Sequence, residues 1–441
     1  MSNHLKLVIT PRRAGLVHGR HNTVDALIRF QATEQPAEHA QRPRQPLNVA
    51  IVIDRSGSMD GRPLREACRA AGVVVERLSA HDRCTVAVYD NMAQTIVPLS
   101  PANEKERFHA ALRRVQAGGS TDLHAGWTEG ASALVPVAGD TAISRVILLS
   151  DGHANAGVTE PAQICSDVER LAAAGVTTST LGLGHGFNEA LMTDMARAGR
   201  GRAHYGQTAD DLMGPLAEEL DLLDAIAARR ITCRIKPSAD VRIEVLNTPR
   251  MAADGLYPMP DVAWASEAVI AVRLSLPAHM TVSETLFELL SVRAMFLDAD
   301  GKETTIDADP LVLPVLDAGE WQDLPADATV ARRFDEIEAA RLQEEARRAA
   351  RRGDWTEAER LIDLMRPLAA RNPWLSAILN ESRDFILQRE VERFSKNARF
   401  TADALSSRIS GIDEDADISN EDQKRSYIAR KMKQGKSRNH N

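Results

Sequence analysis

Short apolar runs alternate with amphipathic stretches from residue 48 to about residue 227. The run VAIVID at 49–54 is typical of a buried strand, and residues 64–78 place apolar side chains at the spacing of one helical face. The alternation continues through CTVAVYD (84–90), RVILLSDG (145–152) and TTSTLGLG (177–184). Because a parallel crossover needs a helix's length of chain, this order predicts a doubly wound α/β domain with a mostly parallel sheet over 48–227.

The segments on either side of this domain have a different pattern. Residues 1–47 and 228–320 contain short alternating or apolar runs such as DALIRFQA and AVIAVRLSL, separated by Pro, Gly and Asp. Such runs predict β-strands. Since they flank the α/β unit, we expect the two flanks to pair into one small β-sandwich into which the α/β domain is inserted. Two independent strand-rich patches are the alternative.

Residues 328–400 are rich in Ala, Arg, Glu and Leu and have no strand signals, which predicts a helical bundle docked on the main body. Gly353 suits a helix end, and Asp354 with Glu357 three positions later has the arrangement of a capping box. The stretch from Arg351 to Trp374 faintly resembles a tetratricopeptide hairpin. Only one such unit is present, and stacked repeats need about three for stability, so a bundle is the better interpretation.

The segment 405–441 has few large apolar residues and strongly separated charges. Residues 411–423 hold six acids and no base, and residues 424–438 hold seven bases and no acid. We expect this tail to be disordered, because it cannot bury enough apolar surface to offset the entropy of ordering. A tethering role for the basic end is the alternative.

Composition narrows the classes of protein and of partner. The 441 residues carry a net charge of −8, so nucleic acid is an improbable partner except through the basic tail. No run of 18 apolar residues predicts a membrane span, and the first residues lack a secretory apolar region. The four cysteines have no disulfide or zinc spacing, which favours free thiols and a cytoplasmic location.

Oxygen-bearing side chains gather where predicted strands end. Asp54, Ser56 and Ser58 follow the first strand of the α/β domain, Thr121 lies at the glycine-rich entry to a helix, and Asp151 follows another strand. Ligands of doubly wound sheets bind outside the carboxyl ends of the strands, so these five residues are expected to converge. The alternative is that Asp54 and the serines only cap the next helix.

Carboxylate and hydroxyl oxygens are hard ligands that suit Mg²⁺, with Mn²⁺ or Ca²⁺ as alternatives. With only two carboxylates among five candidate ligands, the cation stays electrophilic and can accept one more oxygen from outside. An Asp or Glu of a partner protein is the natural donor. The pattern therefore predicts binding of a partner rather than storage of a metal.

The segments VAIVIDRSGSMDG (49–61), GGSTDLHAG and RVILLSDGHANAG together resemble a von Willebrand factor type A (VWA) domain with a complete metal-ion-dependent adhesion site. Within that family the chain is most similar to a bacterial intracellular group that resembles calcium-activated chloride channel regulators and inter-alpha-trypsin inhibitor heavy chains. The resemblance implies β-rich flanks and the metal ligands Asp54, Ser56, Ser58, Thr121 and Asp151. His124 and His153 lie beside the motif as rim residues and not as ligands.

Three hypotheses for function follow. The first is a non-enzymatic module that binds a partner protein through the metal. The second is a metal-dependent hydrolase, such as a phosphatase with Asp54 as nucleophile, although Ser56 stands where such enzymes carry a second aspartate. The third is an adaptor for a AAA+ ATPase or for a signalling or defence complex. A phosphate-binding GxxxxGK[ST] loop and an HExxH zinc motif are both missing from the sequence.

Overall fold

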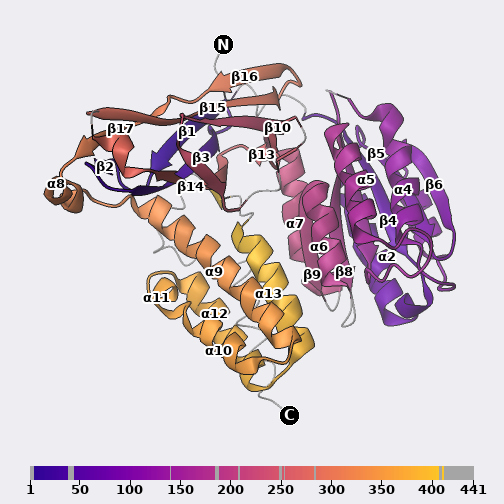
Figure 1. The fold of residues 1–441 in the computed structure, drawn as a ribbon. Coiled ribbons are helices and arrows are strands. Elements are labelled where there is room, and N and C mark those ends of the chain that lie inside the picture. The colour runs from indigo at the N-terminus through magenta and orange to yellow at the C-terminus, as the bar shows by residue number, and fades with distance from the viewer. Residues whose placement is uncertain are drawn as a thin grey trace.

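Three bodies make up the computed structural model: a β-sandwich, an α/β domain and a helical bundle (Figure 1). The structure describes residues 4–37, 44–139, 141–183, 188–206, 209–247, 251–252, 254–282, 285–406 and 410–411, and the statements below concern these residues. None of the helices in this described part combines the length and apolarity that a bilayer crossing requires. Most of the predicted disordered tail, from residue 412 onward, lies outside the described residues.

The central sheet of the α/β domain has the strand order β6-β5-β4-β7-β8-β9. All neighbouring strands are parallel except β6, which pairs antiparallel with β5 at the edge. The strands are β4 (Leu47–Asp54), β5 (Arg83–Tyr89), β6 (Ala93–Pro101), β7 (Ile143–Ser150), β8 (Val176–Leu183) and β9 (Arg200–Gly206). Every residue of β4, β7 and β8 is buried, as expected for strands covered on both faces.

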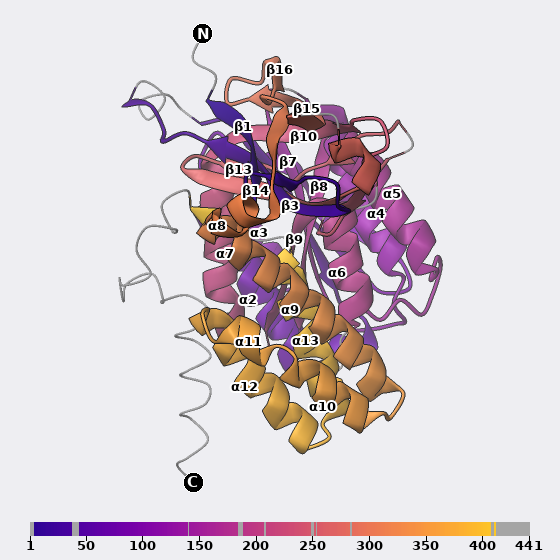
Figure 2. The same cartoon turned by 60° about the vertical axis from the view of Figure 1, so that its left-hand side comes forward.

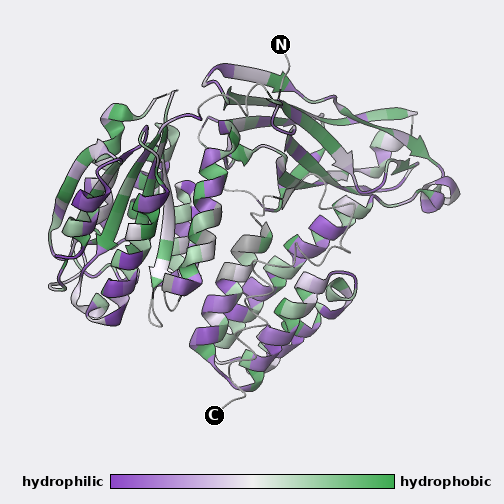
Figure 3. Ribbon diagram, turned by 180° about the vertical axis from the view of Figure 1, so that it is seen from behind, coloured by the Kyte–Doolittle hydropathy of each residue, from purple (hydrophilic) through white to green (hydrophobic). Residues whose placement is uncertain are grey.

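Helices cover both faces of this sheet. Alternate residues of β4 face opposite sides, so that Val49 and Ile51 belong to an apolar cluster with residues of α2, α3 and α7, whereas Ala50 and Val52 belong to a second cluster with residues of α4, α5 and α6. The strands are the most continuously apolar part of the domain, and the outer faces of the helices are polar (Figure 3). The helices are α2 (Arg62–Arg77), α3 (Lys105–Leu112), α4 (Leu123–Leu134), α5 (Pro161–Ala173), α6 (Glu189–Ala198) and α7 (Ala209–Asp224).

The two flanks form one β-sandwich. One sheet has the order β1-β3-β14-β11, with β18 also paired to β14, and the other has the order β12-β10-β15-β17-β2, with β13 and β16 paired beside it. Both sheets share one apolar core. The strands are β1 (Leu5–Pro11), β2 (Leu16–Val17), β3 (Asn22–Ala32), β10 (Ile226–Pro237), β11 (Arg242–Val245), β12 (Tyr257–Pro258), β13 (Val262–Ala263), β14 (Ser266–Leu276), β15 (Leu286–Asp298), β16 (Glu303–Asp307), β17 (Leu311–Leu316) and β18 (Ser410–Gly411). The fold class expected from the sequence is confirmed, including the insertion.

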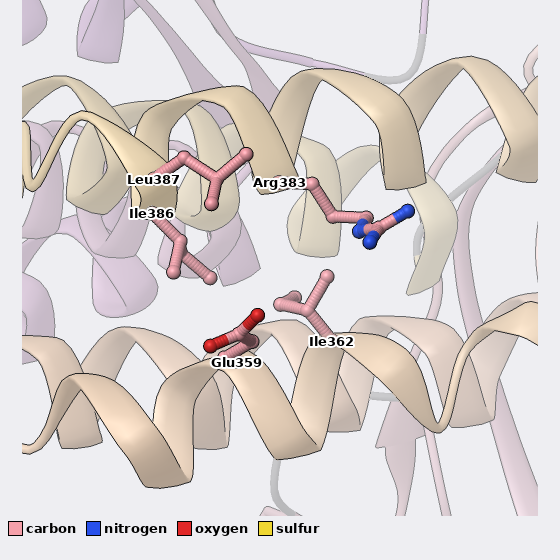
Figure 4. A pocket seen from close by; sticks show the side chains of 5 residues that line it. All are labelled: Glu359, Ile362, Arg383, Ile386 and Leu387. Carbon is pink, nitrogen blue, oxygen red and sulfur yellow. The ribbon is translucent and has the colours of Figure 1, made fainter.

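The helical bundle is joined to the sandwich by its longest helix. Val330, Phe334 and Ile337 of α9 pack on Leu27 and Ala271 of the sandwich. Between α10 and α12, Ile362, Ile386 and Leu387 meet beside Glu359 and Arg383, around a space of about 10 Å³ that holds one water at most (Figure 4). The bundle consists of α9 (Ala328–Arg351), α10 (Trp355–Asp363), α11 (Arg366–Ala369), α12 (Pro373–Leu387) and α13 (Val391–Ser406), whereas the short helix α8 (Ala318–Asp323) lies against the sandwich, where Trp321 donates to the carbonyl of Gly15 at 3.0 Å (Figure 1).

Several element ends differ from the sequence expectations. The spacing of Phe108, Leu112 and Val115 predicts a helix over 104–117, but α3 ends at Leu112, and the following residues form turns closed by backbone hydrogen bonds such as Val115 N to Leu112 O. Helix α13 continues to Ser406, and β18 adds two residues of the expected tail to the sandwich. Asp354 caps α10 by accepting a hydrogen bond from the amide of Glu357, but the amide of Asp354 donates to the carbonyl of Ala349, so only half of the expected capping box is formed.

Charged side chains form ion pairs where the α/β domain meets the sandwich. Arg44, where the chain enters the α/β domain, lies 2.6 Å from Asp82 and 2.6 Å from Asp224, where the chain leaves it. A cavity of about 300 Å³ lies here, lined among others by Pro46 and Ile143 and by Trp264 of the sandwich. The amino ends of β4 and β7 therefore face the sandwich, and their carboxyl ends point away from it.

A buried ion pair supports this joint from inside. Arg145 of β7 donates to Glu219 of α7 at 3.1 Å, and the hydroxyl of Ser179 donates to the same carboxylate oxygen at 2.6 Å. Burial alone would raise the pKa of Glu219, but the charges of Arg145 and His204 hold that pKa well below its usual range. Arg145 also lies 3.6 Å from Asp261 of the sandwich, so the pair links the two bodies.

We predict that Glu219→Gln destabilises the protein at pH 7 by about 3–5 kcal/mol, because it leaves the buried Arg145 without its main counter-charge. A carboxyl whose pKa is lowered by folding contributes stability above its unfolded pKa of about 4.3 and loses it as the pH falls toward the folded value. The difference between wild type and Glu219→Gln should therefore shrink as the pH falls from 5 to 3. Urea unfolding at several pH values measures this.

Asp221→Asn on the same helix is the matched control, because its carboxylate is exposed and pairs only at the surface with Arg77. It should stay within about 0.5 kcal/mol of wild type. Equal stability of Glu219→Gln and Asp221→Asn at pH 7 would contradict the role of the buried pair.

Candidate functional site

Asp54, the last residue of β4, is fully buried, and its carboxylate is held on both sides. The Oδ1 atom accepts a hydrogen bond from the amide of Ser56 at 2.9 Å, and Oδ2 accepts one from the hydroxyl of Ser150 at 2.7 Å. A carboxylate has about four lone-pair positions, so each oxygen keeps one for a further partner. The two hydrogen bonds fix the orientation of the carboxylate at the carboxyl end of the sheet.

The two serines after Asp54 lie in a single turn. Their hydroxyl oxygens are 3.1 Å apart, with Ser56 buried and Ser58 exposed. The buried side chain of Met59 anchors the turn. The amide of Gly57 donates to the carbonyl of Gly119 at 3.0 Å, which ties this turn to the glycine-rich loop before α4. The alternation of serine and glycine therefore aims both hydroxyls at one place, as the sequence predicted.

Thr121 is held between two loops. It is buried, its amide donates to Oδ1 of Asn155 at 2.7 Å, and its carbonyl accepts from the amide of Asn155 at 3.1 Å. The next residue, Asp122, caps α4 by accepting from the amide of Ala125. Gly119 has φ = +70°, and a side chain there would meet Asn91 at 2.6 Å, so glycine is required for this approach.

Asp151 follows β7 and is 7% exposed. Its Oδ1 accepts from the amide of His153 at 3.1 Å, and its backbone carbonyl accepts from the amide of Asn188 at 2.7 Å. Gly152 has φ = +72°, and its amide donates to the hydroxyl of Ser150 at 2.8 Å. Ser150 thus links the carboxylate of Asp54 to the backbone beside Asp151.

Backbone hydrogen bonds join all three loops into one surface, which we call the rim: residues 54–58, 118–122 and 151–157. The five residues singled out in the sequence all belong to it. Burial raises the pKa of Asp54, hydrogen bonds from Ser56 and Ser150 oppose this rise, and the nearby charge of Asp151 adds to it. The negative charge of Asp151 thus disfavours the ionised form of Asp54, and a positive charge at the rim would oppose this effect.

The donor chemistry of the rim fits a hard divalent cation. The candidate ligands offer only carboxylate and hydroxyl oxygens. Among the described residues, no group of three or more His, Cys, Asp or Glu side chains is arranged to hold a metal. A metal at the rim would therefore depend on the hydroxyls of Ser56, Ser58 and Thr121 beside the two acids.

Sequence reasoning missed three residues that shape the rim. Ser150, Asn155 and Asn188 each hold a candidate ligand or its backbone, but their partners lie 96, 34 and 37 positions away in the chain. The position of Ser150 just before Asp151 was the one available signal. The two histidines also differ from each other: His124 is turned to α5, 3.0 Å from Asp167, whereas His153 is exposed.

The four cysteines are free thiols. Cys84 and Cys233 are buried, and burial raises the pKa of Cys68 and Cys165 to about 11. These thiols are held in the protonated state and do not take part in the rim.

The chain is similar in sequence to bacterial proteins and to animal inter-alpha-trypsin inhibitor heavy chains. An uncharacterized protein of Synechocystis is 24% identical over 67% of this chain and 71% of its own length. The uncharacterized protein YfbK of Escherichia coli is 29% identical over 43% of this chain and 33% of its own length. Human inter-alpha-trypsin inhibitor heavy chain H3 is 29% identical over 36% of this chain, which spans only 19% of that protein.

Solved structures show the same fold over nearly the whole chain. A von Willebrand factor type A protein from Catenulispora acidiphila superimposes with a TM-score of 0.70 at 17% identity, covering 93% of this chain and 98% of that one. The ArnB paralog VWA2 from Sulfolobus acidocaldarius gives 0.62 at 19% identity, covering 91% and 99%. The family model of the VWA domain matches residues 48–215, which include the rim, nearly all of the sheet and the helices as far as the first half of α7. Residues 48–215 of this chain are a von Willebrand factor type A domain.

Proposed function

We propose that the chain is a non-enzymatic interaction protein whose VWA domain binds a partner through a divalent cation, Mg²⁺, held by Asp54, Ser56, Ser58, Thr121 and Asp151. The observation that supports the proposal is that these five residues lie on three loops that are joined to one another by hydrogen bonds. VWA domains commonly bind protein partners, and the inter-alpha-trypsin inhibitor heavy chains that this chain resembles are not enzymes.

The burial of the ligands explains why a cation would remain open to a partner. Asp54, Ser56 and Thr121 are at most 1% exposed, so these three ligands would contact the cation from the interior of the protein. Ser58 and His153 are exposed at the edge of the same surface. The side of the cation that faces solvent is then free to take an oxygen from another molecule, and an Asp or Glu supplies a charged one.

The β-sandwich and the helical bundle provide further surfaces, as an adaptor protein requires. The rim points away from the sandwich, and the bundle adds a second large surface beside the VWA domain (Figure 2). We propose that one surface binds the acidic partner and that the others connect it to a larger complex, such as one containing a AAA+ ATPase or a signalling or defence protein.

Titration of Mg²⁺ into the protein by calorimetry tests the metal site. We expect Thr121→Ala to weaken Mg²⁺ binding by about 10–100-fold, because one buried hydroxyl ligand is lost, and Asp54→Ala to abolish it. Ser120→Ala removes an exposed hydroxyl from the neighbouring position and should bind as wild type does. Identical isotherms for wild type and Asp54→Ala would rule out this site.

A second experiment tests partner binding. Wild-type protein with an affinity tag should retain a specific protein from a cell extract in the presence of Mg²⁺ and release it when a chelator is added. Asp54→Ala should retain none of it at any Mg²⁺ concentration. Substitution of one acidic residue of the captured protein by its amide should abolish retention. Retention that is equal with and without chelator would argue that the partner binds elsewhere.

A further inference from the structure

The first turn of α6 lies directly behind the rim. The amide of Asn188 donates to the backbone carbonyl of Asp151 at 2.7 Å, and the side chain of Asn188 caps α6 by accepting from the amide of Leu191. A side chain at Gly152 would come within 2.8 Å of Met192, so this part of the rim packs closely on the helix. Any shift of this helical turn therefore moves the backbone of Asp151.

The opposite side of the same turn is held by the helical bundle. Glu189, the first residue of α6, has a side chain that is 6% exposed, and its Oε1 atom accepts from Nη2 of Arg351 at 2.6 Å. Nε of Arg351 donates to the hydroxyl of Ser395 at 2.9 Å, and that hydroxyl lies 3.3 Å from the same Glu189 oxygen. One guanidinium thus joins α9, α13 and α6, three helices from two separate bodies (Figure 2).

Other contacts between α6 and the bundle are also ionic. Arg399 of α13 pairs with Asp194 of α6 and lies 3.8 Å from Glu344 of α9. The negative charge of Glu189 also stabilises the charged forms of Lys396 and Arg347. Two acids on α6 therefore face a group of bases on the bundle. This arrangement fixes how the bundle docks and makes the docking sensitive to a change of charge.

We infer that Arg351 is a positioning residue for the rim: it holds Glu189, which fixes the start of α6, and through Asn188 this fixes Asp151. Bundle docking and metal binding are then thermodynamically linked, and each strengthens the other by the same factor. The linkage to metal rests on the function proposed above. The ordering of the rim by Arg351 does not, because each contact that it requires joins two residues of this chain.

Hydrogen exchange of backbone amides in the metal-free protein tests the ordering directly. In Arg351→Gln we expect the amides of residues 152–156 and of Asn188 to exchange at least about threefold faster than in wild type, while the strands of the VWA sheet keep their protection. Arg351→Lys, which keeps a charge near Glu189, should restore part of the protection. Arg360→Gln is the matched control, since Arg360 is exposed and pairs only with Glu357 on its own helix.

Calorimetry with Mg²⁺ on the same variants tests the linkage. Arg351→Gln should bind Mg²⁺ at least about threefold more weakly than wild type and Arg360→Gln, and Mg²⁺ should slow amide exchange in residues 391–399 of wild type. Equal rim exchange in Arg351→Gln and wild type overturns the positioning role. If rim exchange changes but Mg²⁺ affinity does not, the linkage is overturned and the metal site stands. If wild type binds no Mg²⁺, the proposed function fails, and the exchange data still decide the role of Arg351.

Discussion

Burial of the Asp54 carboxylate is the constraint around which the functional end of this protein is organised. A buried charge is costly unless hydrogen bonds or a counter-charge compensate it. Ser56 and Ser150 supply two hydrogen bonds, and both residues are themselves held by the loops that follow their strands. Repulsion from Asp151 remains uncompensated by these contacts. Positive charge at the rim would oppose this repulsion, which is the link between the fold and the metal-dependent binding that we propose.

Much of the fold could be predicted from the sequence because its signals are local. Buried parallel strands are continuous apolar runs, the helices between them have one apolar face, and the change to Ala- and Arg-rich sequence marks the bundle. The position of the five candidate ligands was predictable for the same reason, since each follows a strand or precedes a helix at one edge of the sheet, and their role as ligands stays a prediction. The pairing of the two flanks followed from their shared strand pattern on either side of the insertion.

Long-range partners could not be predicted in this way. Ser150, Asn155 and Asn188 look like ordinary polar loop residues until folding places them against Asp54, Thr121 and Asp151. The contact between Arg351 and Glu189 spans 162 positions, and each residue alone resembles a solvated helix charge. Strand order in the sandwich is equally non-local, because β3 pairs with β14 across the whole inserted domain. The early end of α3 reflects turn geometry that its apolar pattern does not encode.

The ion pair between Arg44 and Asp224 brings the two crossing points of the chain together at one end of the VWA domain. The insertion of about 180 residues therefore begins and ends at neighbouring places on the sandwich, as a short surface loop would. The entropy cost of closing a loop grows only slowly with its length, and an insert that folds by itself with its ends close together lowers this cost further. The sequences of the sandwich and of the VWA domain can therefore change independently of each other, provided that the distance between Arg44 and Asp224 is kept.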